Sequence, residues 1–303
     1  MTTPAQQPHL TRIAVATDFS PPAATAADRA ARLAHEHGAG LSLLHVISSG
    51  WIEELRTWLG EDTQWKDRLT AQTLDRLQAE AARLAQAGGR EVAPVLLEGN
   101  PVQALATAVL EQQADLLAVG ARGSNPLHHL LVGTTAERLL RKVSCPLLVV
   151  RQAATLAYRR VLVPLDFSPW SGHAVALARR VAPDAHLVLM HNFGIPFEEK
   201  LRFAGVDDAT LIHYRERARA EARQRLQDFV LENRLAEHAY SLSLTEGDAP
   251  QHILTQASGR GCDLIVIGKH GRQAAEELLL GSVTKHVVAE AGCDVLVSTA
   301  HAG

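Results

Sequence analysis

The chain has 303 residues, of which 47% are apolar, and its formal net charge is −3. This length favours about two globular domains, and the small charge argues against nucleic acid as a partner. We expect a cytoplasmic protein without membrane insertion, because the sequence has no secretory leader pattern and no apolar run of about 18 residues, and its three cysteines form no CxxC pair.

The first half of the chain alternates short apolar runs with amphipathic segments. The apolar runs are typical of strands buried on both faces of a sheet. They lie at residues 12–17, 41–47, 91–97, 115–120 and 146–151. The segments between them predict helices, with proline or glycine near their ends and apolar residues three or four positions apart. These helices cover residues 21–37, 62–87, 101–113 and 134–143.

The second half of the chain repeats the first. The sequence RIAVATDFSP begins at Arg12 and RVLVPLDFSP begins at Arg160, so that Asp18 and Asp166 lie 148 residues apart. The same offset relates four further pairs: Gly99 and Gly247, Gly120 and Gly268, Gly133 and Gly281, and Cys145 and Cys293. One module therefore occurs twice. We place the two domains at residues 1–152 and 157–303, and the short join between them predicts that the modules contact each other.

Alternating strands and helices predict an α/β fold with two tandem open-sheet domains, each a five-stranded parallel sheet sandwiched by about four helices. Such sheets bind ligands beyond the carboxyl ends of their strands, where the strand order reverses. If strands one and four are central neighbours, Asp18 lies near Gly120, and Asp166 lies near Gly268. Edge strands seek partners, and the two strand-five sequences, PLLVV and DVLVS, are suited to such pairing.

Each module has the same glycine pattern after strand four. Two glycines three residues apart are followed by nine residues, then by a third glycine and a residue with a hydroxyl side chain. In the first module these are Gly120, Gly123, Gly133 and Thr134, and in the second they are Gly268, Gly271, Gly281 and Ser282. Turned loop amides and the amino end of a helix both favour phosphate, so the pattern indicates an anion site. It is neither a P-loop nor the dinucleotide fingerprint, because His270 follows Gly268-Lys269 and the glycine spacing differs.

The pattern Gly-x-x-Gly, nine residues, Gly-Ser/Thr resembles the nucleotide-binding signature of the universal stress protein family. The DFS sequence after strand one, LHV at the end of strand two and LLLGSVTKHV in the second module are similar to that family as well. The resemblance covers nearly the whole chain as a tandem pair. It implies strand order 3-2-1-4-5 in each module, with ATP, alone or with Mg²⁺, over the carboxyl ends of the strands. It also implies that the two copies of strand five pair within the chain.

The resemblance also implies roles for single residues. The glycines and the hydroxyls of Thr134 and Ser282 would hold phosphates, and Asp18 and Asp166 would lie near the ribose and any metal. The backbone near two strand-two residues would meet the adenine, at Val46 and Asn192. Pro164 and Val283 in the second module also follow the family pattern, where the first module has Ala16 and Thr135.

Simpler explanations exist for many of these residues. Asp18 and Asp166, like Thr134 and Ser282, could be helix N-caps. Charged residues inside the glycine loops could be solvated, and the histidines at the ends of strand two could be packed or capping. The pair His128-His129 lacks the further ligands that zinc needs, so we predict no metal-binding residues of this kind.

Two other patterns are expected to belong to the core. The cysteines Cys145 and Cys293 precede strand five, where a small buried side chain fits. Trp51, Trp58 and Trp65 recur every seven residues, which is typical of a packed helical stripe, with a lid or an interaction face as the alternative.

Three functions remain open from the sequence. The first is an ATP-binding protein that responds to stress through nucleotide-dependent conformation or assembly, as an internal pseudo-dimer or a homodimer. The second is a slow ATPase or another nucleotide-dependent enzyme, although no transferase signature or clear catalytic base is present. The third is a scaffold that binds no nucleotide and pairs through strand five.

Overall fold

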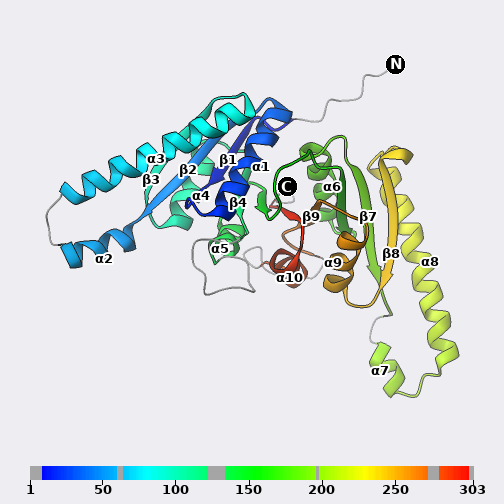
Figure 1. Ribbon diagram of the computed structural model, residues 1–303. Coiled ribbons are helices and arrows are strands. Elements are labelled where there is room, and N and C mark those ends of the chain that lie inside the picture. Colours follow the sequence, from blue (N-terminus) through cyan, green and yellow to red (C-terminus); the bar gives the residue numbers. More distant parts are fainter. Residues whose placement is uncertain (1–8, 60–63, 122–133, 196–197, 272–279, 300–303) are drawn as a thin grey trace.

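The computed structural model describes residues 9–59, 64–121, 134–195, 198–271 and 280–299 (Figure 1). The first module contains β1 (Arg12–Ala16), α1 (Pro21–His37), β2 (Gly40–Ser48), α2 (Ser49–Leu59), α3 (Gln64–Gly88), β3 (Val92–Gly99), α4 (Pro101–Glu111), β4 (Leu116–Gly120), α5 (Thr134–Lys142) and β5 (Leu147–Val150). The second contains β6 (Arg160–Leu165), α6 (Pro169–Val181), β7 (His186–Phe193), α7 (Glu198–Phe203), α8 (Asp208–Glu232), the short 3₁₀ helix η1 (Glu237–Ala239), β8 (Tyr240–Glu246), α9 (Ala249–Gly259), β9 (Leu264–Gly268), α10 (Ser282–Glu290) and β10 (Asp294–Ser298).

The ten strands of the described residues belong to one sheet, in the order β3-β2-β1-β4-β5-β10-β9-β6-β7-β8. Each module is parallel and has the expected strand order 3-2-1-4-5. The modules join where β5 and β10 pair antiparallel, with Leu148 opposite Leu296. The two strand-five edges therefore satisfy each other within one chain.

Helices cover both faces of the sheet. The buried side chains of α1, α3, α6 and α8 pack on one face, and those of α4, α5, α9 and α10 pack on the other. The described part of each module has five α-helices rather than about four, because the long connection after strand two contains two of them. The pairs α2–α3 and α7–α8 extend outward at opposite ends of the molecule (Figure 1).

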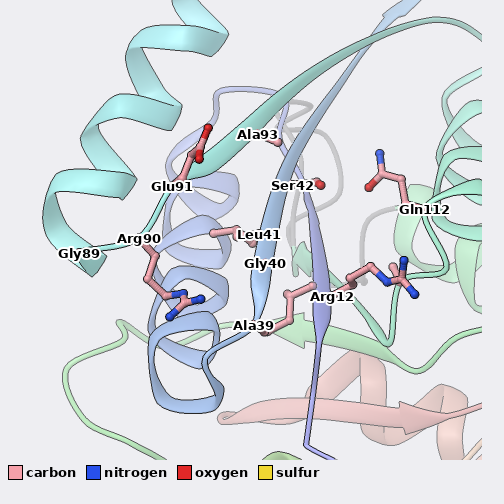
Figure 2. Close-up of a pocket in the computed structure, with 12 residues that line it drawn as sticks. Arg12, Ala39, Gly40, Leu41, Ser42, Gly89, Arg90, Glu91, Ala93 and Gln112 are labelled. Carbon is pink, nitrogen blue, oxygen red and sulfur yellow. The ribbon is translucent and has the colours of Figure 1, made fainter.

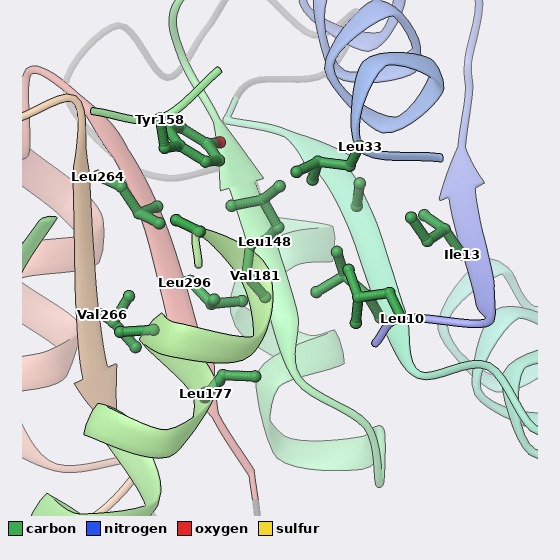
Figure 3. Close-up of a cluster of buried hydrophobic side chains, with 14 of the residues drawn as sticks. Leu10, Ile13, Leu33, Leu148, Tyr158, Leu177, Val181, Leu264, Val266 and Leu296 are labelled. Carbon is green, nitrogen blue, oxygen red and sulfur yellow. The ribbon is translucent and has the colours of Figure 1, made fainter. Parts of the chain in front are cut away.

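The core is continuous across the two modules. Leu10, Ile13, Leu33 and Leu148 from the first module lie in the same buried cluster as Leu177, Val181, Leu264 and Leu296 from the second (Figure 3). Burial of apolar surface is the main favourable term in folding and association. This shared cluster therefore stabilises the pairing of the modules as well as each module.

The join between the modules is held by the buried carboxylate of Asp294, at the start of β10. Its Oδ1 accepts hydrogen bonds from the backbone N–H groups of Arg151, at 2.7 Å, and Gln152, at 3.0 Å. Its Oδ2 accepts a 2.7 Å hydrogen bond from the Tyr158 hydroxyl and lies 3.3 Å from Nε of Arg29 on α1. The Arg29 guanidinium also stacks on the Tyr158 ring. One carboxylate thus connects the first helix, the join and the last strand.

The tryptophan repeat is not a single core stripe. Trp51 and Trp58 belong to α2 and Trp65 belongs to α3, with residues between the two helices outside the described part. Trp58 is 88% exposed, so the core prediction is wrong for that residue, while Trp65 is half-buried. None of the described helices combines the length and apolarity that a membrane crossing requires.

Candidate functional site

A cavity of about 770 Å³ lies at the carboxyl ends of the strands in the second module. It is bounded by the ends of β6, β7 and β9 and by the first turns of α6, α9 and α10. Every second-module residue predicted from the sequence lines it, namely Pro164, Asp166, Asn192, Gly268, Gly271, Gly281, Ser282 and Val283. The size is within the range of small-molecule sites, roughly 300–1,000 Å³.

The two ends of the glycine pattern meet at this cavity. The backbone N–H of Gly281 donates a 3.1 Å hydrogen bond to the carbonyl of Lys269, although the two residues are separated by the nine-residue interval. The Thr284 hydroxyl donates a 2.7 Å hydrogen bond to the carbonyl of Gly268. The loop after β9 and the start of α10 therefore form one structure, with loop amides beside the amino end of a helix. Residues 272–279 lie outside the described residues.

Neighbouring groups lie close to two glycines of this loop. A Cβ on Gly271 would lie 3.1 Å from Oδ2 of Asp166, which is tighter than an ordinary contact. A Cβ on Gly281 would lie 3.4 Å from the Lys269 carbonyl oxygen. The absence of these side chains leaves the backbone open to the cavity.

Gly120 and Gly268 have a second reason to be glycine. A Cβ on Gly120 would lie 2.8 Å from the carbonyl carbon and oxygen of Pro22, in the first turn of α1. A Cβ on Gly268 would lie 3.1 Å from the His270 carbonyl oxygen in its own loop and 3.3 Å from the Cβ of Trp170, at the equivalent place in α6. Close packing of strand four on helix one accounts for Gly120 without any ligand, and it contributes at Gly268 together with the loop carbonyl.

The aspartates after strand one organise a tight turn. Oδ1 of Asp166 accepts hydrogen bonds from the Ser168 N–H, the Ser168 hydroxyl and the Ser171 hydroxyl, at 2.9, 2.6 and 2.9 Å. Asp18 accepts from the N–H and hydroxyl of Ser20 in the same way. The N-caps of α1 and α6 are Ser20 and Ser168, so the N-cap explanation of the aspartates is wrong. Oδ2 of Asp166 faces Gly271 instead.

A stack of three side chains supports this turn in each module. Phe167 lies against His191, with ring centroids 4.3 Å apart. The guanidinium of Arg225, a residue of α8, lies 4.3 Å from the centroid of the Phe167 ring. In the first module Phe19, His45 and Arg76 form the same stack. Such cation–π contacts favour one fixed ring orientation.

The two histidines hold the end of strand one. Nδ1 of His45 donates to the Thr17 carbonyl at 2.8 Å, and Nδ1 of His191 donates to the Leu165 carbonyl at 2.7 Å. Burial lowers the pKa of His45, and the hydrogen bond to Thr17 and the charge of Asp18 oppose this shift. The expectation that these histidines are packed or capping fits these contacts.

The remaining second-module residues contribute to the cavity wall. The Asn192 amide donates to the Gly247 carbonyl at 2.7 Å and its oxygen accepts from the Thr245 hydroxyl at 3.0 Å, which fixes the ends of β7 and β8. Ser282 is the first residue of α10 and Gly281 is its N-cap, so the cap explanation of the Ser282 hydroxyl is wrong. That exposed hydroxyl lines the cavity.

The first module is described less completely at its equivalent site. Asp18 is exposed at the end of β1, and Val46 is half-buried in β2, packed against the core. Thr134 is the first residue of α5. Gly123 and Gly133, with Arg122 and His128-His129, lie outside the described residues.

A second cavity of about 610 Å³ lies at the opposite, amino ends of the first module's strands. Its charged residues are Arg12, Arg90 and Glu91. Figure 2 shows Arg12 and Arg90 extending to opposite sides of β2. Arg12 donates to the side chain of Gln113, and Arg90 donates to the carbonyl of Gly38. Since its charges do not converge, this cavity is a weaker candidate than the one in the second module.

The cysteines are buried, and metal-ligating side chains form no cluster among the described residues. Within them, no group of three or more His, Cys, Asp or Glu side chains is placed to hold a metal ion. Burial raises the pKa of Cys145 and Cys293 to about 12 and that of Cys262 to about 11. The thiolate is the reactive form, so these cysteines are packing residues.

Sequence and structure comparisons agree on the class of protein. The model of the universal stress protein family matches residues 9–151 and again 157–299. A universal stress protein of Thermus aquaticus is 32% identical over 142 residues, covering 46% of this chain and 97% of its own. One from Mycobacterium tuberculosis is 26% identical over 304 residues, covering 94% of this chain and 95% of its own.

Solved structures show the same architecture along the whole chain. A universal stress protein from Archaeoglobus fulgidus superposes with a TM-score of 0.70 at 18% identity, covering 95% of this chain and 97% of that one. A putative universal stress protein from Pseudomonas aeruginosa gives a TM-score of 0.64 at 19% identity, with 95% and 93% covered. The chain belongs to the universal stress protein family, as a tandem of two such domains.

Proposed function

We propose that this protein binds ATP, with its triphosphate between the Gly268–Gly271 loop and the start of α10. The observation that supports the proposal most strongly is the meeting of these two segments at one cavity, through the hydrogen bond from Gly281 to Lys269. Backbone amides and the amino end of a helix are favourable partners for phosphate. The Ser282 hydroxyl adds a donor at the same place.

The other cavity residues fit the remaining parts of the ligand. Asp166 lies beside the loop, where a carboxylate suits a ribose hydroxyl, and a carboxylate together with phosphate oxygens is a usual way to hold Mg²⁺. Apolar groups from Pro164, Ile253 and Val283 line the cavity with Asn192, as expected for the binding of a flat base. We propose the same roles in the first module for Asp18, Val46, Gly120, Gly123, Gly133 and Thr134.

We propose further that bound ATP favours one arrangement of the paired modules or of a larger assembly. A ligand shifts such an equilibrium only by its different affinity for the two states. Both glycine loops lead into α5 and α10, and these helices contact each other through Lys285 and Glu137, 3.6 Å apart. This contact supports a coupling between the two proposed sites, because it joins the helices that follow the two glycine loops.

The proposal is tested by nucleotide extraction followed by calorimetric titration with ATP and Mg²⁺. Gly281→Arg should abolish binding at the second site, because its side chain would occupy the place of the phosphates. Gly259→Arg is the matched control: Gly259 ends α9, is exposed and has nothing within 4 Å of a built Cβ. If the wild-type protein binds no nucleotide at millimolar ATP, the proposal fails and the scaffold hypothesis replaces it. Phosphate release measured in parallel decides whether ATP is consumed.

A further inference from the structure

Helix α10 is held at both ends, and the two contacts come from different modules. Its amino end is fixed within the second module, by the Gly281 N–H and the Thr284 hydroxyl. Its carboxyl end is held by Arg151, which follows β5 of the first module. The Arg151 guanidinium donates to the carbonyls of Val288 and Ala289, the latter at 3.1 Å.

These contacts are favourable for two reasons. The last carbonyls of a helix have no partner within the helix, and Arg151 satisfies two of them. A cation at the carboxyl end also interacts favourably with the helix dipole. Gln152 adds a hydrogen bond to the carbonyl of Gly292, just after α10, at 3.0 Å.

The starting point of the Arg151 side chain is itself fixed. The Arg151 backbone N–H donates to Asp294, whose side chain is fully buried. The first module thus holds α10 from a rigid anchor rather than from a flexible linker. Because α10 has only nine residues, a displacement of its carboxyl end is transmitted to its amino end.

The pseudo-symmetric position provides a comparison within the chain. Residue Thr299 lies 148 positions after Arg151 and follows β10. Its hydroxyl donates to the carbonyl of Ser144, beyond the end of α5, at 3.0 Å. A single neutral hydrogen bond thus stands where Arg151 makes two charged ones. The first module therefore holds α10 more strongly than the second module holds the end of α5.

We propose that Arg151 is a positioning residue for the second module's nucleotide site, acting from the first module through α10. The inference rests on the proposed function of that site. Arg151 does not line the cavity, so its effect on the ligand is indirect. Without Arg151, α10 would occupy its binding-competent position in only part of the molecules, and the apparent affinity would fall by that fraction.

The test measures each site separately. Second-site affinity for ATP is titrated by calorimetry in a Gly133→Arg background, and first-site affinity in a Gly281→Arg background. Arg151→Met, which keeps the length of the side chain but removes its donors, should weaken second-site binding about fivefold, as expected if α10 is correctly placed in roughly one molecule in five. First-site affinity should not change. Thr299→Val is the matched control and should leave second-site affinity within about twofold of the parent.

Two further readouts separate positioning from general destabilisation. Arg151→Lys retains a cation at the helix end and should restore most of the second-site affinity, and it decides the question if the Met variant does not fold. Hydrogen exchange without nucleotide should be faster in Arg151→Met than in the parent at the Gly281 and Lys285 amides, which are hydrogen-bonded at the start of α10. Equal weakening of both sites, or unchanged second-site affinity with unchanged exchange, overturns the inference. If the parent protein binds no ATP but Arg151→Met still exchanges faster than the parent, Arg151 does hold α10 and the proposed function is refuted.

Discussion

The carboxylate of Asp294 offers the sharpest prediction about stability. Asp294→Ala would leave Arg29 buried without its counter-ion, since the exposed fractions of the two side chains are 5% for Arg29 and 0% for Asp294. It would also remove the acceptor for two backbone N–H groups and for the Tyr158 hydroxyl. Removing one partner of a buried ion pair costs about 3–5 kcal/mol.

Arg29→Met should cost less, about 1–3 kcal/mol, because Asp294 keeps its three other donors. The free energy of unfolding is measured by urea titration followed by circular dichroism. Asp184→Ala, at an exposed position, is the control and should change that free energy by no more than about 0.5 kcal/mol. The reasoning is refuted if Asp294→Ala costs under about 1 kcal/mol, or if Arg29→Met costs more than Asp294→Ala.

Three further predictions concern single sites. Gly120→Ala should destabilise the protein by about 1–3 kcal/mol in thermal or urea unfolding, because its Cβ would meet the backbone of α1 at 2.8 Å; a neutral result would contradict that packing. Asp115 accepts hydrogen bonds from Thr11 and Arg12 and forms an ion pair with Arg180. Burial raises the pKa of this carboxyl group, but the three partners outweigh burial and lower the pKa to about 2. Since the folded state prefers the ionised carboxylate, the contribution of Asp115 to folding stability is complete above the unfolded pKa of 3.8 and is lost as the pH falls through 2. The difference in unfolding free energy between wild type and Asp115→Asn should therefore shrink between about pH 4 and about pH 2. A constant difference over that range would exclude this linkage. The three cysteines should resist a thiol reagent at pH 8 until the protein unfolds, and rapid labelling of the native protein would show that they are less buried than described.

The repeat made most of the fold predictable. An unchanged offset of 148 residues between paired landmarks identified two copies of one module. The apolar runs of the first copy identified its five strands, and the repeat extended them to the second copy. The pairing of β5 with β10 was implied by the family resemblance, and the need of edge strands for partners agrees with it. The strand order itself came from the family resemblance rather than from periodicity.

The connection after strand two was the least predictable part. A seven-residue tryptophan spacing is the same whether the helix continues or is interrupted, so one stripe was expected where two helices occur. Exposure is set by what packs on a helix, and α2 extends outward with Trp58 88% exposed. The local sequence does not show whether another element packs on α2.

The residues at the site likewise divide into those that the sequence predicted and those that it did not. Glycines and aspartates in a spaced motif were visible in the sequence, and the second-module set lines one cavity. The arginines that stack on Phe19 and Phe167 were not identified, because the partners are about 57 residues apart and no motif joins them. Arg151 was missed for the same reason, since its carbonyl partners are 137 and 138 residues away.

The most direct test of the proposed site is an experimental structure of the protein grown with ATP and Mg²⁺. We predict triphosphate density between the Gly271 amide and the first turn of α10, with Asp166 beside the ribose or the metal. Nucleotide bound instead at the amino ends of the first module's strands, near Arg12 and Arg90, would contradict this account. So would a second-module cavity that stays empty at saturating ATP.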